Sequence, residues 1–336
     1  MKFPIDLSAY TPLRFSIDQQ ELSAADKAVL EKNVQLVRDG IIFFTALANT
    51  KGLGGHTGGA FDIVPEVLIL DAFMKGSGTV HPVFFDEAGH RVAIQYMMAV
   101  LNGYRPEESL FHYREYGHGL YGHPERDDKN GIFFSSGRLG HLWSHVNGVA
   151  EADRSKVVVM FGSDGSQMEG DNAEAARYAV SRNLNVKLFI DDNNITIAGH
   201  PSEYMRGYDV ANTLRGHGLA VSDGDGEDIG SLYHRIWQAL VQQGAGAVIS
   251  RRPMAPGVKG IEGTPKGHDV IAVDLAVAYL RDRGLDAAAE MLENPPAKAA
   301  KRSYLGSTDK MYKVRDQFGK VVCDILGGLE KPEEKV

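Results

Sequence analysis

Apolar runs bounded by glycine and polar turns alternate along the chain with apolar residues at helical spacing. Residues 157–161 (VVVMF) and 186–190 (VKLFI) are the clearest runs, and such runs are typical of strands buried in a parallel sheet. A helical pattern at 172–181 lies between them, and shorter apolar runs at 219–222 and 247–250 predict two more strands. This alternation predicts an α/β protein whose mostly parallel sheet is flanked by helices on both faces.

Helical spacing also predicts the organisation of the rest of the chain. Ser23 is placed to cap a long helix over residues 24–49, and a glycine-rich loop at 51–55 separates it from a helical stretch at 63–74. Further helices are predicted at 208–218 and 229–242. We expect an N-terminal extension (1–23), a main domain (24–285), a proline-containing linker (286–308) and a C-terminal helix within 309–336.

Composition narrows the class of protein. The chain has 336 residues, of which 43% are hydrophobic and 24% charged, as in an ordinary soluble globular protein. Its net charge of −8 argues against a nucleic-acid partner, which would require a basic face. No apolar run approaches the length of a membrane span, and residues 1–15 do not resemble a secretory signal. The single cysteine, Cys323, excludes an internal disulfide and suits a cytoplasmic location.

Polar residues follow the two clearest strands at the point where each is expected to end. Asp164 and Gly165 follow the first strand, Asn193 follows the second, and 27 residues (166–192) separate Gly165 from Asn193. The carboxyl ends of neighbouring parallel strands share one sheet edge, where open α/β folds bind ligands. Carboxylate, amide and carbonyl oxygens suit Mg²⁺ completed by phosphate oxygens. Either half alone is more often a simple turn, so the pairing is what predicts a metal site.

The two strand ends resemble the thiamine diphosphate signature of the transketolase family. The first half matches in Asp164-Gly165 and Glu169-Gly170, and the second in residues 191–199 (DDNNITIAG). The resemblance implies that Asp164, Asn193 and the carbonyl group of Ile195 hold Mg²⁺ (or Ca²⁺ or Mn²⁺), which bridges to the cofactor's diphosphate. Ser163 replaces the first glycine of the motif. Because serine still offers a backbone N–H, we expect a tighter turn rather than a lost site.

Histidines are concentrated in the first half of the chain, where eight of the 12 lie between His56 and His145. A zinc site is one interpretation, but the sequence has only one cysteine, Cys323, and no spacing of cysteines and histidines that would fix a whole tetrahedron. The transketolase resemblance implies another: His56 follows a glycine-rich loop, His90 follows Gly89, and residues 122–125 (GHPE) contain His123. It implies catalytic roles for these three residues and for His268, with His90 also lying against the cofactor.

Residues 135–150 resemble the family segment that lines the cofactor, which implies contacts from Gly137 and Leu139. The chain departs from that segment at Arg138, His141 and His145. Arg138 is either a clamp for an anionic substrate group or an ordinary surface arginine. Glu169 matches the family's dimer-interface glutamate, although a glutamate at a helix start is also favoured by the helix dipole.

The resemblance covers only the diphosphate-binding half of a transketolase, from about residue 24 to residue 285. No segment resembles the region that supplies the glutamate needed to activate the cofactor. We therefore expect a two-component transketolase-like enzyme that transfers a two-carbon ketol unit between sugar phosphates or related substrates. A second subunit would carry the pyrimidine-binding and C-terminal domains, and we expect the chain to homodimerise or to form a heterotetramer. The alternatives are a subunit of a 2-oxo acid decarboxylating or phosphoketolase-like enzyme, and a non-catalytic cofactor-binding regulatory subunit.

Overall fold

The computed structural model describes residues 2–296, 322–324 and 326–328. The chain divides into two compact units, 1–296 and 297–336, and the fold is that of the first unit. The expected C-terminal helix within 309–336 lies largely outside the described residues. Of the expected linker, residues 286–293 form a helix, α11 (Asp286–Glu293), which follows α10 (Val273–Asp282).

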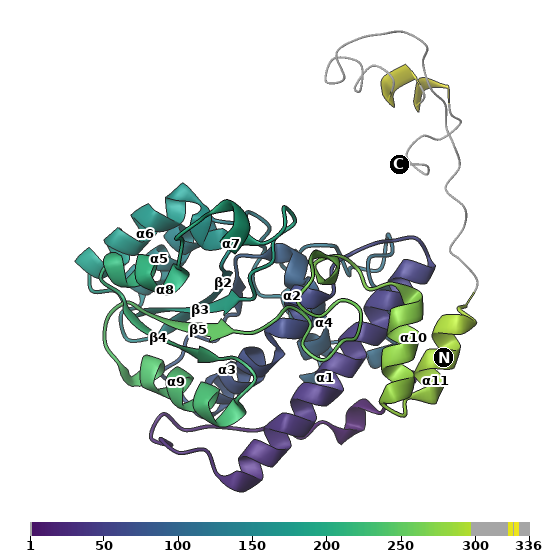
Figure 1. The fold of residues 1–336 in the computed structure, drawn as a ribbon, viewed down its shortest axis with the longest axis horizontal. Coiled ribbons are helices and arrows are strands. Elements are labelled where there is room, and N and C mark those ends of the chain that lie inside the picture. The colour runs from purple at the N-terminus through teal and green to yellow at the C-terminus, as the bar shows by residue number, and fades with distance from the viewer. Residues whose placement is uncertain (1, 297–321, 325, 329–336) are drawn as a thin grey trace. The chain divides into compact units, whose positions relative to one another are not determined.

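A five-stranded parallel sheet forms the centre of the first unit (Figure 1). Its strands are β1 (Phe85–Asp86), β2 (Val158–Ser163), β3 (Val186–Asp192), β4 (Ala220–Asp225) and β5 (Gly246–Arg251). Their order is β1-β2-β3-β5-β4. The register pairs Ser163 at the end of β2 with Asp191 in β3. The residues that follow these two strands therefore emerge at the same sheet edge, as the sequence predicts.

Helices cover both faces of the sheet because side chains alternate along its strands. Val158 and Met160 of β2 pack into one apolar cluster, whereas Val159 and Phe161 pack into the other. The first cluster includes residues of α5 (Leu142–Ala152), α6 (Gly170–Ser181) and α8 (Val210–Gly216). The second includes residues of α1 (Ala24–Thr50), α3 (Val64–Gly76), α4 (Val92–Leu101) and α9 (Ile229–Val241). The predicted fold class is confirmed.

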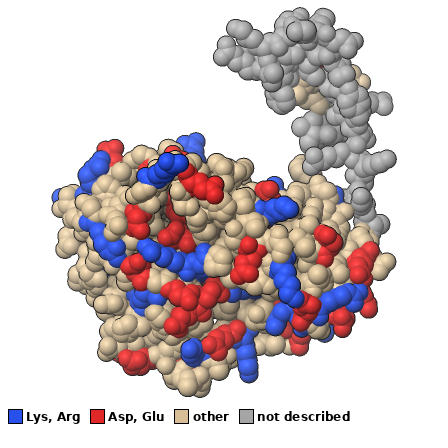
Figure 2. All heavy atoms as spheres, in the orientation of Figure 1, with Lys and Arg blue, Asp and Glu red and all other residues tan. Residues whose placement is uncertain are grey.

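Two short helices lie close to the carboxyl edge of the sheet: α2 (Gly58–Asp62) and α7 (Pro201–Tyr204). The N-terminal segment packs on the domain, since Phe15 is buried and its N–H donates to the carbonyl of Ala72 in α3 at 3.0 Å. On the face shown in Figure 2, acidic and basic side chains are interspersed, so this face carries no extended basic patch. Among the described residues, no helix has the length and apolar character needed to cross a membrane.

Candidate cofactor and substrate site

Asp164 lies directly after β2 and is fixed against β3. Its backbone N–H donates to the carbonyl of Asp191 at 3.0 Å, and one carboxylate oxygen accepts the Gly165 N–H at 2.7 Å. Its side chain is buried, and its other carboxylate oxygen, Oδ2, has no hydrogen-bond partner among the residues that the structure describes. Burial and the charges of Asp191 and Asp192 raise the pKa of Asp164 to about 8. A bound cation would remove this penalty, because an adjacent positive charge favours the ionised form.

Asn193 follows β3, and its amide orientation is set by its neighbours. The amide nitrogen donates to Asp62 Oδ2 and to Asp191 Oδ2, both at 3.0 Å. Carboxylate oxygens only accept hydrogen bonds when ionised, so they fix the nitrogen on their side. The amide oxygen then accepts the Ile195 N–H at 2.9 Å. The Ile195 carbonyl accepts no backbone hydrogen bond from residues 2–296.

These atoms provide the donor set that a hard cation requires. The unpartnered Oδ2 of Asp164, the Asn193 amide oxygen and the Ile195 carbonyl oxygen all come from adjacent strand ends. Buried polar atoms normally have hydrogen-bond or ion partners. An unpaired carboxylate oxygen at the carboxyl edge of the sheet is therefore suited to bind a cation. The residues present therefore fit a divalent cation with oxygen ligands.

Ser163 tightens the turn that follows β2. Its backbone N–H donates to the Ser166 hydroxyl at 2.9 Å, and its own hydroxyl accepts the Ser166 N–H at 3.1 Å. The Ser163 N–H is thus already engaged within the turn, contrary to the expectation that it stays available for a phosphate. At Gly165 the backbone is ordinary right-handed, but an added Cβ would lie 3.0 Å from the Thr196 side chain. This glycine is therefore required for close packing rather than for an unusual conformation.

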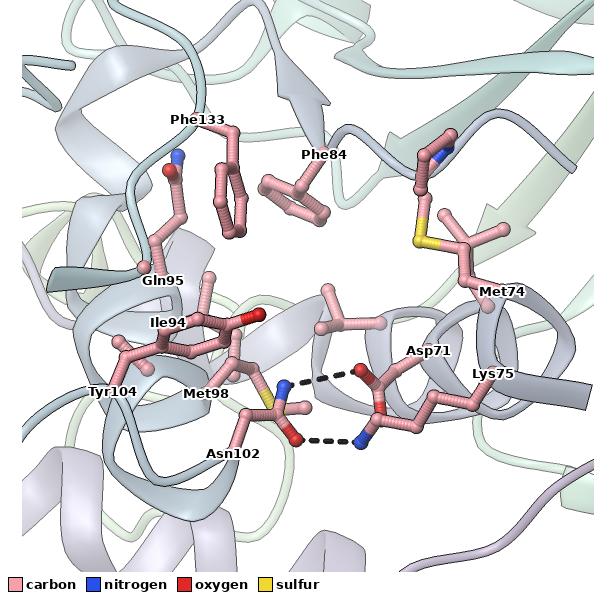
Figure 3. Close-up of a pocket in the computed structure, with 15 residues that line it drawn as sticks. Asp71, Met74, Lys75, Phe84, Ile94, Gln95, Met98, Asn102, Tyr104 and Phe133 are labelled. Carbon is pink, nitrogen blue, oxygen red and sulfur yellow. Dashed lines mark hydrogen bonds and ion pairs between the residues drawn. The ribbon is translucent and has the colours of Figure 1, made fainter. Parts of the chain in front are cut away.

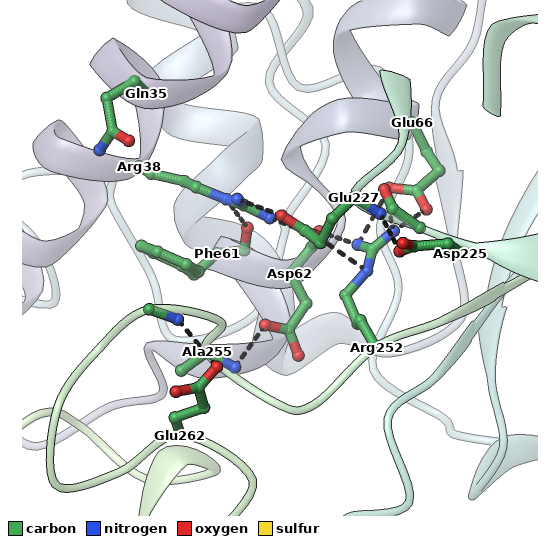
Figure 4. Close-up of polar contacts among 12 residues, drawn as sticks. Gln35, Arg38, Phe61, Asp62, Glu66, Asp225, Glu227, Arg252, Ala255 and Glu262 are labelled. Atoms are coloured by element: carbon green, nitrogen blue, oxygen red, sulfur yellow. Dashed lines mark hydrogen bonds and ion pairs between the residues drawn. The ribbon is translucent and has the colours of Figure 1, made fainter. Parts of the chain in front are cut away.

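An ionic network surrounds the buried Asp62 of α2 (Figure 4). Asp62 Oδ1 accepts the Ala255 N–H at 2.7 Å, while the guanidinium of Arg252 binds the Asp62 carbonyl and the Glu66 carboxylate. Glu227 joins the same network by pairing with Arg38 of α1 at 2.7 Å and with Arg252 at 3.3 Å. The network fixes α2 against the sheet and so fixes the partner of Asn193.

The four predicted histidines are brought together from distant parts of the chain. Ring centroids lie 4.9 Å apart for His56 and His90 and 5.1 Å apart for His56 and His268, with His90 and His268 also at 5.1 Å. The ring of His123, which is exposed, lies beside the His90 loop, because a Cβ on Gly89 would come 2.7 Å from it. Its pKa is lowered, first by partial desolvation and then by the charge of His56. Burial is also the main cause of the lowered pKa values of His90 and His268. These three imidazoles are therefore neutral at pH 7.

The start of α2 allows this convergence because it consists of glycines. A Cβ on Gly58 would lie 2.3 Å from the carbonyl oxygen of Gly267, the residue before His268. A Cβ on Gly59 would lie 3.1 Å from the Arg91 side chain, with His90 Nε2 at 3.8 Å. His56 itself is tied to the other loop, since its Nδ1 lies 3.0 Å from the His268 carbonyl oxygen. Residues without side chains thus let three loops meet.

Glu87 is a buried carboxyl group that the sequence analysis did not single out. It follows β1, has no exposed surface, and accepts a hydrogen bond from Asn172 of α6 at 3.0 Å. Burial raises its pKa to about 7, and its Oε2 has no hydrogen-bond partner within residues 2–296. A signal was available: two acidic residues, Asp86 and Glu87, directly follow an apolar pair at a strand end. Asp62 carries a similar signal, as a single acid inside the apolar run 60–64 (AFDIV).

The segment that departs from the family pattern lies at the surface. Arg138, His141 and His145 are exposed and line a cavity of about 380 Å³ with Gly137 and the buried Leu142. Gly137 packs on His123, because an added Cβ would lie 3.2 Å from that ring. Leu139 is 37% exposed. Glu169 is exposed at the N-cap of α6 and lies against Gly140, where a Cβ would come within 2.2 Å of its side chain.

One cluster among the described residues has the composition of a metal site: the ligand atoms of His112, Glu115 and His118 lie within 4.8 Å of one another. The two imidazole rings are stacked, with centroids 3.9 Å apart and planes at 4°. Lone pairs lie in the ring planes, so parallel rings cannot both point at one ion. Glu115 also pairs with Lys51. The arrangement does not support the zinc interpretation.

A separate apolar cavity of about 310 Å³ lies between α3 and α4 (Figure 3). Its walls are mostly apolar side chains, including Met74, Phe84 and Met98. The polar groups at one end satisfy each other, since Asn102 bonds both Asp71 and Lys75. None of the predicted site residues lines this cavity.

Comparison with known proteins identifies the family of the domain. Residues 81–283, more than half of the chain, match the family model "Transketolase, thiamine diphosphate binding domain". The chain therefore belongs to the transketolase family through this domain.

Individual relatives match it to different extents. One of the subunits of the apulose-4-phosphate transketolase of Actinobacillus succinogenes is 26% identical over 271 residues, which are 75% of this chain and 96% of the relative. The chloroplastic transketolase of Solanum tuberosum is 31% identical over 212 residues, 56% of this chain but 28% of that protein. The chain thus spans nearly all of the first relative and less than a third of the second.

Solved structures show the same fold. The transketolase of Campylobacter jejuni superposes with a TM-score of 0.66 at 20% identity and covers 89% of this chain and 49% of that one. The transketolase of Leishmania mexicana gives a TM-score of 0.61 at 19% identity, over 78% and 44% of the two chains. At these sequence identities the similarity establishes the fold alone.

Proposed function

We propose that this chain is the thiamine-diphosphate-binding subunit of a two-component transketolase-like enzyme that transfers a two-carbon ketol unit between sugar phosphates or related substrates. The observation that carries the proposal is the difference in coverage: the chain matches 96% of a relative named as a transketolase subunit, but 28% of a plant transketolase. A second polypeptide would carry the pyrimidine-binding and C-terminal domains, and the two would assemble as a symmetric pair of heterodimers.

In this proposal residues 24–285 form the domain that holds the cofactor. Asp164, Asn193 and the carbonyl of Ile195 hold Mg²⁺, or Ca²⁺ or Mn²⁺, which binds the diphosphate; the orphaned oxygen of Asp164 supports this assignment. When bound, thiamine diphosphate supplies the carbon nucleophile and the electron sink that cleavage next to a carbonyl requires. Gly137, Leu139 and the exposed Glu169 are assigned to the edge that faces the cofactor and the neighbouring subunit.

The histidine cluster supplies acid–base groups. The carbonyl of His268 can only accept, so His56 Nδ1 carries the proton and, in the neutral ring, Nε2 is the acceptor. His56 is thereby prepared to take a proton from a substrate hydroxyl. His123 and His268 are neutral at pH 7 because their pKa values are lowered, mainly by burial, so they can bind hydroxyl groups and relay protons. His90 packs against both loops, on the side assigned to the cofactor.

The test is reconstitution with the partner chain, Mg²⁺ and thiamine diphosphate, assayed with xylulose 5-phosphate and with pyruvate as donors. Ketol transfer from the sugar phosphate supports the proposal. Decarboxylation of pyruvate, or release of acetyl phosphate, would identify one of the alternative enzymes, and cofactor binding without turnover would identify a regulatory subunit.

A calorimetric titration tests the site itself. Asp164→Ala is expected to weaken cofactor binding at least about 100-fold, because a ligand to the bridging ion is lost. Asp128→Ala is the matched control, since its carboxylate is 52% exposed and pairs only with Arg126. Equal binding by wild type and Asp164→Ala would refute the assignment of the metal ligands.

A further inference from the structure

Arg114 adopts a backbone conformation that is costly for a side-chain-bearing residue. Its φ is +62°, in the left-handed region, and its N–H donates to the Leu120 carbonyl at 2.8 Å. This closes a loop whose Gly117 and Gly119 also have positive φ. Such strain persists where the surrounding structure over-determines a residue, which is common at ligand-binding sites.

The guanidinium of Arg114 lies between the two glycines that precede His56 and His123. A Cβ on Gly122 would come 2.9 Å from Arg114 Cζ, and a Cβ on Gly55 would come 3.3 Å from its Cδ. The arginine therefore reaches the histidine cluster only because both positions lack a side chain. Its charge also contributes, after burial and the charge of His56, to lowering the pKa of His123.

This guanidinium has no counter-ion among residues 2–296. The adjacent carboxylate, Glu115, is bound by Lys51 and His112 instead. The other arginine next to the cluster, Arg91, is buried and paired with Asp86. The half-buried Arg114 is thus a cation beside the histidine cluster without a carboxylate partner among residues 2–296.

We propose that Arg114 binds an anionic group of the substrate, a phosphate or a carboxylate, beside His56 and His123. The inference rests on the proposed function, because it names the substrate class of the same site. A guanidinium offers two parallel N–H donors to such a group, which neutral histidines do not. The substrate accepted by this chain is therefore anionic at the end that lies against the loop 113–121.

Two variants separate the side chain from the fold. Arg114→Gly removes the guanidinium and relieves the positive φ, so its backbone conformation is retained. Gly122→Ala keeps the charge but displaces it, since the clash is with the far end of a flexible side chain. Arg126→Gln is the matched control, because Arg126 is 67% exposed and pairs with Asp128.

The first experiment measures kcat and KM of the reconstituted pair with xylulose 5-phosphate, xylulose and hydroxypyruvate. Arg114→Gly is expected to raise KM about 10- to 100-fold for the anionic donor, as the loss of a charged hydrogen-bonded contact predicts. The KM of Arg114→Gly for xylulose is expected to stay within about threefold of the wild-type value. An effect on xylulose 5-phosphate alone identifies a phosphate, and one on hydroxypyruvate alone a carboxylate. Equal effects on all three donors, or on none, would overturn the proposal.

The second experiment does not depend on turnover and so separates this proposal from the proposed function. The thermal shift of the full chain is titrated with inorganic phosphate and with glycolate. Arg114→Gly and Gly122→Ala are expected to weaken binding of at least one anion about tenfold, and Arg126→Gln to leave it unchanged. If neither anion distinguishes Arg114→Gly from wild type, Arg114 is not an anion-binding residue, whatever reaction the pair catalyses.

Discussion

Removing Glu66 should destabilise the domain more than removing any exposed carboxylate. The side chains of Arg252 and Glu66 are only 0% and 3% exposed, so the guanidinium cannot reach water when its partner is lost. Breaking a buried ion pair from one side costs about 3–5 kcal/mol, because an uncompensated charge stays buried. Arg252 would keep the Gly226 carbonyl at 3.1 Å and Glu227 at 3.3 Å. Because these contacts remain, we expect Glu66→Ala to lower the free energy of unfolding by about 3 kcal/mol, near the lower end of that range.

The assay is urea unfolding followed by tryptophan fluorescence, since Trp143 is fully buried and reports the loss of the core. The midpoint should fall with no change in m, because the folded state keeps its compactness. Asp128→Ala should lower the free energy of unfolding by less than about 1 kcal/mol, as expected for an exposed ion pair. A loss below about 1 kcal/mol for Glu66→Ala would refute the reasoning, since it would mean that water or a neighbour compensates Arg252.

Three further predictions concern buried residues. Glu87 has a pKa of about 7 in the fold against 4.5 for a free side chain, so the folded state binds the extra proton and stability falls as pH rises through that window. Glu87→Gln should remove this pH dependence of stability. The variant should be more stable than wild type by about 3 kcal/mol at pH 8 and differ little from it at pH 4. Urea unfolding of both proteins at the two pH values measures the difference. Gly58→Ala should displace the His268 loop and lower kcat of the reconstituted pair about tenfold or more, whereas Gly148→Ala, where nothing lies within 4 Å of the added Cβ, should not. Leu70→Ala enlarges the apolar cavity and should cost about 3–5 kcal/mol, while Leu139→Ala, at an exposed position, should be near neutral in the same unfolding assay.

The sheet and its ligand-binding edge could be predicted from the sequence because the signals are local. Apolar runs mark β2 and β3, and the polar residues at their ends are read directly from the chain. The two-residue strand β1 is too short to give a pattern. Helix α10 was also missed: Ala276 and Leu280 are its only buried residues, and its remaining apolar side chains are at most partly buried.

The contacts that shape the site could not be predicted, because their partners are distant in the chain. Asn193 is oriented by Asp62, 131 residues away, and Glu87 bonds Asn172, 85 residues away. Arg114 is flanked by Gly55 and Gly122 in space, and no local pattern indicates that. The histidines were singled out through family resemblance, whereas their meeting depends on the glycines of α2.

Helix α2 connects the two halves of the candidate site. Its first residue, Gly58, touches the loop of His268, and its last residue, Asp62, binds the amide of Asn193. Five residues of rigid helix thus set the separation between the histidine cluster and the oxygen ligands at the strand ends. A cofactor anchored by its diphosphate at the strand ends would present its reactive part at a distance that this helix defines. In the proposed function, the buried network around Arg252 would therefore contribute to the geometry of the site as well as to stability, because it fixes α2 against the sheet.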